Sequence, residues 1–182
     1  SNVDPDLLGN AYEYLIKHFA DLTNKKAGEF YTPRSVVHLL GLILDPHEGE
    51  TIYDPACGSG GMLTESQNFI KDEEGEIKAT SDVYLYGKEI NDETYAICKS
   101  DMMIKGNDPE NIKVGSTLAA NTFSNTKFDF MLSNPPYGKS WSSDLKYIKD
   151  GKTIIDPRFE VTLSDYWGNN EVCDATPRSS DG

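Results

Sequence analysis

The feature that most constrains the fold of this chain is a short strand pattern that runs directly into a glycine-rich loop and then into a helix. The strand pattern is Thr51-Ile52-Tyr53-Asp54, and the loop is Pro55-Ala56-Cys57-Gly58-Ser59-Gly60-Gly61. The residues that continue at helical spacing after the glycines are Met62, Leu63, Ser66, Phe69 and Ile70. This order is typical of a parallel α/β sheet, in which ligands bind beyond the carboxyl ends of the strands.

The sequence does not match two other kinds of glycine-rich loop, because its glycines are spaced differently. A dinucleotide fingerprint that starts at Gly58 requires glycine where this chain has Leu63. The run Gly138-Lys139-Ser140 matches the end of a P-loop, but the earlier glycine of that motif is Ser133 here. The three glycines after Cys57 let backbone approach a ligand closely, and the helix start behind them favours a carboxylate. A plain strand-to-helix turn remains the alternative.

The rest of the chain alternates between strand and helix patterns. Further strands are predicted over residues 83–87 (running on to Lys88-Glu89), 112–114 and 128–132. One helix is predicted from residue 6 to about 19, with Leu8, Tyr12, Leu15 and Phe19 on its apolar face. A second follows Thr32 as N-cap and Pro33 in the first turn, with the apolar stripe Val36, Val37, Leu40, Ile43 and Leu44. A third is capped by Asn91 and carries Tyr95, Cys98 and Met102.

The pattern divides the chain into three parts. Residues 1–35 form a helical lead, residues 36–137 a sheet-and-helix core, and residues 138–182 a polar segment. Within the core, residues 71–82 are polar and are predicted to form an exposed insertion. The last part is rich in Gly, Ser and Asp, so we expect a flexible active-site loop without regular structure, or a chain cut before its next helix. The predicted fold is α/β and doubly wound, with a mostly parallel sheet that stops after its fourth strand.

Composition limits the functions that this chain can carry alone. It has 17 Lys and Arg against 30 Asp and Glu, a net charge of −13. Affinity for duplex DNA comes largely from basic side chains, so the chain by itself is expected to bind DNA poorly. Three dispersed cysteines and three dispersed histidines predict a reducing, cytoplasmic setting and no metal site. No apolar run is long enough for a membrane span, and no signal sequence is seen.

Two groups of residues are candidates for chemistry. Glu89 ends the second predicted strand, where an acidic side chain can accept hydrogen bonds from ribose hydroxyls; a solvated carboxylate is the alternative. Asn134-Pro135-Pro136-Tyr137 follows the fourth strand. The Asn134 side-chain oxygen and the Pro135 carbonyl can accept both hydrogens of a planar amine and favour its pyramidal, reactive form. Tyr137 offers a face on which an extruded base can stack.

Three motifs that follow one another along the chain resemble those of the amino-adenine DNA methyltransferases. They are most similar to those of modification subunits of type I restriction systems. They are Gly28-Glu29-Phe30-Tyr31-Thr32-Pro33-Arg34, Asp54-Pro55-Ala56-Cys57-Gly58-Ser59-Gly60-Gly61 and Asn134-Pro135-Pro136-Tyr137. The resemblance implies that the S-adenosylmethionine site is lined by Glu29, Phe30, Tyr31, Thr32, Pro33, Arg34, Asp54, Gly58, Ser59, Gly60, Gly61 and Glu89. It implies that Asn134, Pro135, Pro136 and Tyr137 hold the adenine.

The chain departs from the family pattern in two ways. Gly115 is followed by Ser116, where the family often has an acidic residue that meets the adenine of the cofactor. Members of the family resemble one another in having a seven-stranded sheet, whereas only four strands are predicted here. The later strands and the helices that dock on a specificity subunit are expected to be absent from this chain.

The expected function is methyl transfer from S-adenosylmethionine to adenine N6 in DNA, within a complex that includes a specificity subunit and a restriction subunit. The partner chain would supply the basic surface that this chain lacks. Two alternatives stay open: methylation of RNA or of a protein glutamine, and an inactive fragment that binds the cofactor.

Overall fold

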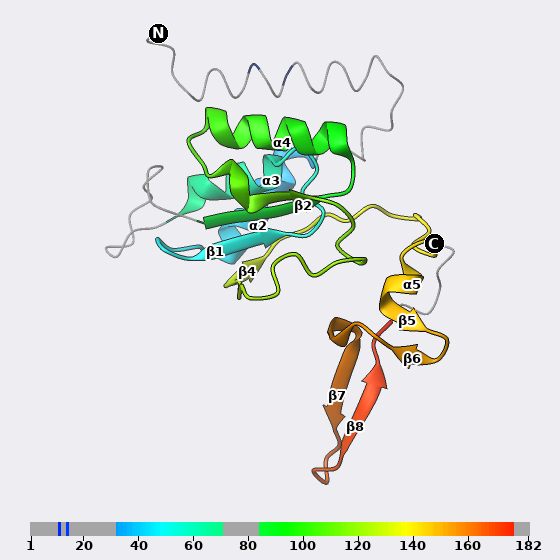
Figure 1. Ribbon diagram of the computed structural model, residues 1–182. Coiled ribbons are helices and arrows are strands. Elements are labelled where there is room, and N and C mark those ends of the chain that lie inside the picture. The colour runs from blue at the N-terminus through cyan, green and yellow to red at the C-terminus, as the bar shows by residue number, and fades with distance from the viewer. Residues whose placement is uncertain (1–10, 12–13, 15–31, 71–83, 177–182) are drawn as a thin grey trace. The chain divides into compact units, whose positions relative to one another are not determined.

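The computed structural model describes residue 11, residue 14 and residues 32–70 and 84–176. The chain forms two compact units, and each is considered by itself. The first unit comprises residues 1–117 and 122–135, and the second comprises residues 118–121 and 136–182. Figure 1 shows the elements of both. Among the described residues, no helix is long and apolar enough to span a membrane.

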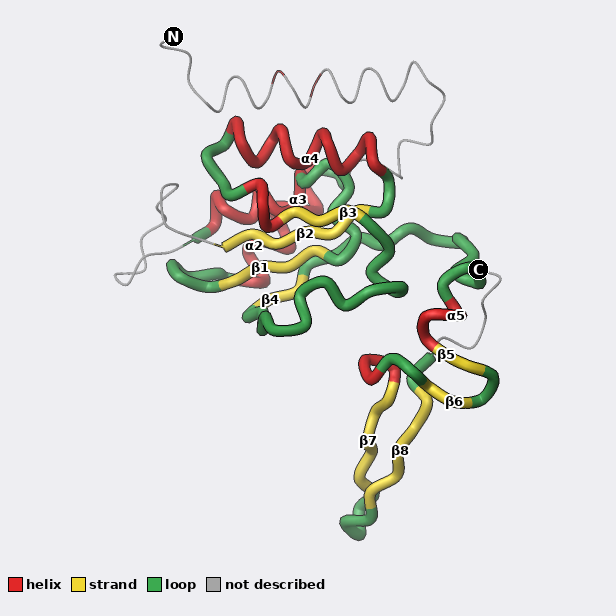
Figure 2. The backbone as a smooth tube through the Cα atoms, viewed as in Figure 1, coloured by secondary structure: helices red, strands yellow, loops and turns green. Residues whose placement is uncertain are grey.

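The first unit is built on a four-stranded sheet in the order β3-β2-β1-β4. Its strands are β1 (Thr51–Asp54), β2 (Tyr84–Glu89), β3 (Ile112–Val114) and β4 (Phe130–Met131). All three pairings are parallel, with Ile52 opposite Leu85 and Phe130, and Gly87 opposite Ile112. Figure 2 shows the strands side by side. The four predicted strands of the core sheet are therefore confirmed, and their order reverses between β1 and β4, as in a doubly wound sheet.

The fourth strand is shorter than the predicted range of 128–132. Leu132 still donates its N–H to the Tyr53 carbonyl at 3.0 Å. Phe128 lies outside the strand, and its ring stacks on that of Tyr53, with centroids 4.5 Å apart. Phe123 and Tyr86 pack edge-on in the same aromatic cluster. This cluster covers the face of the sheet that carries the side chains of Tyr53 in β1 and Tyr86 in β2.

Three helices pack on the opposite face of the sheet. They are α2 (Arg34–Leu44), α3 (Gly61–Ser66), which continues as the 3-10 turn η2 (Gln67–Phe69), and α4 (Asp92–Ile104). The core between helices and strands contains Val37, Ile52, Leu63, Leu85, Cys98, Met102 and Ile112. The predicted cap of α4 is confirmed, because Asn91 Oδ1 accepts the Thr94 N–H at 3.0 Å.

Helix α2 differs from prediction in its cap and in its buried face. Thr32 is not the N-cap: Pro33 holds that position, and its carbonyl accepts the N–H groups of Val36 and Val37. Val36 and Ile43 were predicted on the buried stripe but are exposed. The reason is Gly41, whose missing side chain leaves room for the Phe69 ring; a Cβ there would lie 2.4 Å from Phe69 Cδ2. This close contact turns residues 37 and 41 inward.

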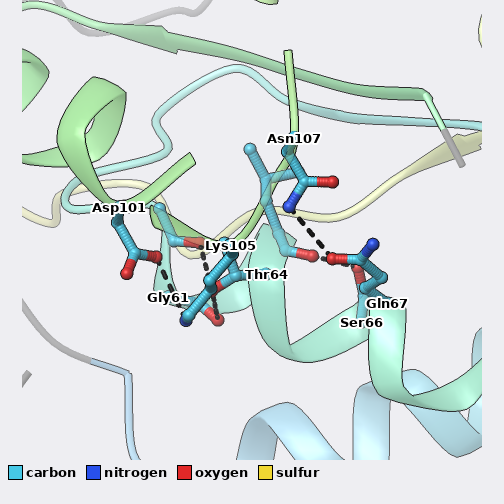
Figure 3. Close-up of polar contacts among 9 residues, drawn as sticks. Gly61, Thr64, Ser66, Gln67, Asp101, Lys105 and Asn107 are labelled. Carbon is cyan, nitrogen blue, oxygen red and sulfur yellow. Dashed lines mark hydrogen bonds and ion pairs between the residues drawn. The ribbon is translucent and has the colours of Figure 1, made fainter. Parts of the chain in front are cut away.

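A polar cluster joins α3 to the end of α4 (Figure 3). Lys105 Nζ forms an ion pair with Asp101 Oδ2 at 3.1 Å and donates to Thr64 Oγ1 at 2.9 Å. Asn107 Nδ2 donates to Gln67 Oε1 at 3.0 Å. Because Asp101 is buried, its charge requires this partner, and the pairing helps to define how the two helices meet behind the glycine loop.

The second unit has regular structure, so the expected structureless run after Tyr137 is wrong. It contains α5 (Leu145–Ile148), a hairpin of β5 (Lys149–Asp150) and β6 (Thr153–Ile154), the 3-10 turn η4 (Pro157–Phe159), and a hairpin of β7 (Glu160–Ser164) and β8 (Asn170–Asp174). The turn of the longer hairpin depends on Asp165, whose carboxylate accepts the N–H groups of Trp167 and Asn169. Polar and apolar residues alternate in β7, with Val161 and Leu163 as the apolar ones, but every residue of the strand is exposed, so this alternation marks no buried face.

Some predictions lie outside the described residues. They concern most of the helix over residues 6–19, of which Ala11 and Tyr14 are described and helical. They also concern Glu29, Phe30 and Tyr31, and the insertion over residues 71–82.

Candidate active site

The candidate site lies at the carboxyl edge of the sheet. Because β1, β2 and β4 are parallel, their carboxyl ends share that edge. Asp54 ends β1, Glu89 ends β2, and Asn134 follows β4 by three residues. The chain order reverses between β1 and β4, and such a switch point opens a crevice beyond the strand ends in doubly wound sheets.

The loop after β1 turns tightly through two glycines with positive φ. Gly58 has φ +56° and Gly60 has φ +87°. The loop is attached to the next strand, because the Cys57 N–H donates to the Lys88 carbonyl at 3.0 Å. A Cβ on Gly58 or Gly61 would meet no atom within 4 Å, whereas one on Gly60 would lie 2.7 Å from Cys98 Sγ. Gly60 therefore serves packing against α4, and the other two leave open space beside the loop.

This contrast predicts different effects of alanine at the two strained positions. Gly58→Ala is expected to lower the free energy of unfolding by roughly 1 kcal/mol, the cost of a left-handed conformation alone. Gly60→Ala is expected to lower it by about 3 kcal/mol, because the methyl group also collides with Cys98. Urea denaturation of the two variants measures the difference. Equal losses would show that Gly60 is not pressed against α4.

Glu89 holds the loop and the next helix together. Its Oε2 accepts the Gly58 N–H at 2.9 Å, and its Oε1 accepts the Asn91 N–H at 2.8 Å. A carboxylate has about four lone-pair positions, so each oxygen can accept one further hydrogen bond. The side chain is half-buried. It is thus oriented by the backbone on two sides and retains acceptor capacity at the edge of the sheet.

Asp54 is a buried carboxyl directly before the loop. Its side chain is 2% exposed, and its Oδ1 accepts the Ala56 N–H at 2.9 Å. Burial raises the pKa of Asp54 to about 7, and the charge of Glu89 acts in the same direction. The Ala56 hydrogen bond and the Ser133 side chain oppose that rise in pKa. Asp54 is therefore an acid whose charge responds to its surroundings near neutral pH.

Asn134 is connected to the segment that precedes α2. Its Nδ2 donates to Thr32 Oγ1 at 3.2 Å, and both side chains are half-buried. Pro135 is exposed and is the last residue of the first unit. Pro136 and Tyr137 belong to the second unit, and the Tyr137 side chain is 84% exposed.

The structure thus brings together part of the predicted site. Asp54, Gly58 and Glu89 are linked through contacts around one loop, and Thr32 meets Asn134. Pro33 and Arg34 are exposed at the start of α2, and Ser59 is half-buried. Among the described residues, no group of three His, Cys, Asp or Glu side chains is placed to hold a metal ion.

Two residues near the site were not predicted. Ser133 influences the pKa of Asp54, and Thr117 donates its hydroxyl to the Pro55 carbonyl. The sequence signal for Ser133 is only its position before Asn134. Thr117 is separated from Pro55 by 62 positions, so no local pattern could identify it.

Similarity to known proteins shows the family to which this chain belongs. The sequence profile described as N-6 DNA Methylase matches residues 3–171. The chain belongs to this N-6 DNA methylase family. Its parallel α/β sheet is that of the S-adenosylmethionine-dependent methyltransferase fold, as predicted.

The chain is also similar to individual proteins of restriction-modification systems. The chain is 35% identical over 138 residues to the methylase subunit of the type I restriction enzyme HindI from Haemophilus influenzae, covering 75% of this chain and 30% of that protein. It is similar to the crystal structure of a type I restriction-modification methyltransferase subunit from Streptococcus thermophilus, with 34% identity, a TM-score of 0.64, and coverage of 83% and 32%. A putative class I S-adenosylmethionine-dependent methyltransferase from Listeria monocytogenes shares the fold at 17% identity and a TM-score of 0.58, with coverage of 84% and 48%. The chain therefore spans about a third of the length of these restriction-system relatives.

Proposed function

We propose that this chain is the cofactor-binding and catalytic part of a type I modification subunit that transfers a methyl group from S-adenosylmethionine to adenine N6 in DNA. The observation that supports the proposal is the shared edge of β1, β2 and β4, because the glycine loop, Glu89 and Asn134 follow the carboxyl ends of these adjacent parallel strands at a topological switch point. The family to which the chain belongs supports the choice of substrate.

The residues around the loop fit S-adenosylmethionine, which when bound supplies an electrophilic methyl group. The space beside Gly58 and Gly61 lets a ligand approach the backbone. Glu89 is held so that its acceptor positions suit ribose hydroxyls. Ser59 completes the loop side of the proposed site, where Gly60 and Asp54 shape the loop from its packed side. Residues 29–34 form the other side of the proposed site.

Asn134 and Pro135 carry the proposed chemistry on the acceptor. The adenine amine is a weak nucleophile because its lone pair is delocalised into the ring. The Asn134 Oδ1 and the Pro135 carbonyl would accept the two amine hydrogens and so favour a pyramidal nitrogen with a localised, reactive lone pair. Pro136 limits the freedom of that backbone carbonyl, and Tyr137 provides the stacking face for the extruded base. No covalent enzyme intermediate is required.

The charge of the chain supports a role within a complex. With a net charge of −13, the chain is expected to reach DNA through partners that carry basic surface. We propose that these are the specificity and restriction subunits of the same cytoplasmic system. Methylation of RNA or of protein glutamine finds no support in the named relatives.

The test uses the complete native polypeptide assembled with its partner chains. Labelled S-adenosylmethionine is supplied with duplex DNA that contains the target site, with the same DNA carrying N6-methyladenine at the target, and with RNA of the same sequence. We expect label in the unmodified DNA alone, recovered as N6-methyladenine. Label in RNA or protein, or no transfer at all, would refute the proposed function.

A further inference from the structure

The contact between Thr32 and Asn134 joins two parts of the site that are 102 positions apart in sequence. Thr32 directly precedes Pro33, whose carbonyl accepts the N–H groups of Val36 and Val37 at 2.9 and 3.1 Å. The Thr32 backbone is thereby held at the start of an 11-residue helix that packs in the core. The position of the Thr32 hydroxyl is therefore restricted, and a hydrogen bond to it can orient the Asn134 side chain.

The two ends of a carboxamide differ in chemistry, so its orientation matters. Nδ2 of Asn134 donates to Thr32 Oγ1, which places Oδ1 at the opposite end of the planar amide. In the proposed reaction Oδ1 is the end that accepts an amine hydrogen. A reversed amide would direct its own N–H groups at the amine hydrogens and oppose the reaction.

We infer that Thr32 is a positioning residue for methyl transfer, whose hydroxyl holds the Asn134 amide with its oxygen toward the acceptor amine. This inference rests on the proposed function and deepens it. It assigns Thr32 a task in addition to lining the proposed cofactor site, because the hydroxyl acts on the reaction through Asn134. It also explains why the residue before Pro33 is a threonine although it does not cap the helix.

The test compares Thr32→Val, which keeps the shape but removes the hydroxyl, with Thr32→Ser, which keeps the hydroxyl. In the complete enzyme with its partner chains, single-turnover rates are measured at saturating cofactor and DNA, per active site counted by cofactor titration. Thr32→Val is expected to slow the rate about three- to tenfold, the worth of one net hydrogen bond. Thr32→Ser is expected to restore the rate, and because the cofactor is saturating, any change in the Kd for S-adenosylmethionine does not enter the comparison of rates. Thr122→Val, at an exposed threonine, is the control for the substitution itself.

Each other outcome is decisive. An unchanged single-turnover rate in Thr32→Val, with an active wild type, would overturn the positioning role and leave the proposed function standing. Weaker cofactor binding with a normal saturated rate would confine Thr32 to the cofactor site and overturn the positioning role. A lower melting temperature and fewer active sites, with a normal rate per site, would make its role structural. Absence of methyl transfer in the wild type would refute the proposed function itself.

Discussion

Replacing Asn134 with alanine is expected to slow methyl transfer by roughly 100- to 1000-fold, the usual cost of removing one acceptor or donor that acts in the transition state. The side chain lies at the end of β4 beside the switch point, and its amide is oriented by Thr32. In the proposed reaction the Asn134 oxygen is used by the amine and not by the cofactor, so the Kd for S-adenosylmethionine should remain that of the wild type. The loss should therefore appear in kcat and in kcat/KM equally.

The measurement is steady-state and single-turnover methylation of target DNA, with calorimetry for cofactor binding. Asn125→Ala is the matched control, since Asn125 is exposed in the same unit. Asn134→Ala should exceed the effect of Thr32→Val, because it removes the acceptor and not merely its support. An Asn134→Ala enzyme that retains more than about a tenth of wild-type kcat would show that this amide does not act in the transition state.

The stability of the cofactor-free protein is expected to fall as pH rises from about 4 to about 7 because of Asp54. Burial raises the pKa of this carboxyl from 3.8 to about 7 in the folded protein. Between those values the folded state holds a proton that the unfolded state has released. The free energy of unfolding therefore decreases with pH, and the contribution of Asp54 is present below pH 4 and lost above pH 7. A difference of about three pKa units corresponds to roughly 4 kcal/mol.

The substitution that isolates this effect is Asp54→Asn, which stays neutral while its oxygen can still accept the Ala56 N–H. Urea denaturation at several pH values should show the wild type losing roughly 3–4 kcal/mol relative to Asp54→Asn between pH 4 and pH 8. The comparison uses the slope with pH, so a constant offset between the proteins does not matter. Parallel curves for Asp54→Asn and the wild type would mean that Asp54 titrates at its ordinary value.

Local patterns were sufficient to predict the elements of the core sheet and the loop at its centre. The strand Thr51–Asp54, the glycine turn and the Asn91 cap depend on residues within a few positions of one another. Parallel pairing follows from the alternation of strand and helix, and it places Asp54, Glu89 and Asn134 at one edge. The class of fold and the three motifs of the candidate site could therefore be predicted from the sequence.

Only the tertiary structure decided which side chains meet. Gly41 fits the Phe69 ring and so rotates α2, which exposes Val36 and Ile43 against the expectation from periodicity. In the hairpin of β7 and β8, Val161 and Leu163 alternate with polar residues but are both exposed, so only the structure shows that this short pattern pairs as a hairpin.

The contacts within the site were also decided by tertiary structure. Glu89 joins the loop to α4, and Thr32 joins the start of α2 to Asn134. Such contacts depend on how distant segments pack, and a single sequence records the residues but not the distances between them. What the sequence by itself determined is the set of chemical groups at this site, and what the fold decided is their orientation, because orientation depends on partners that lie far away along the chain.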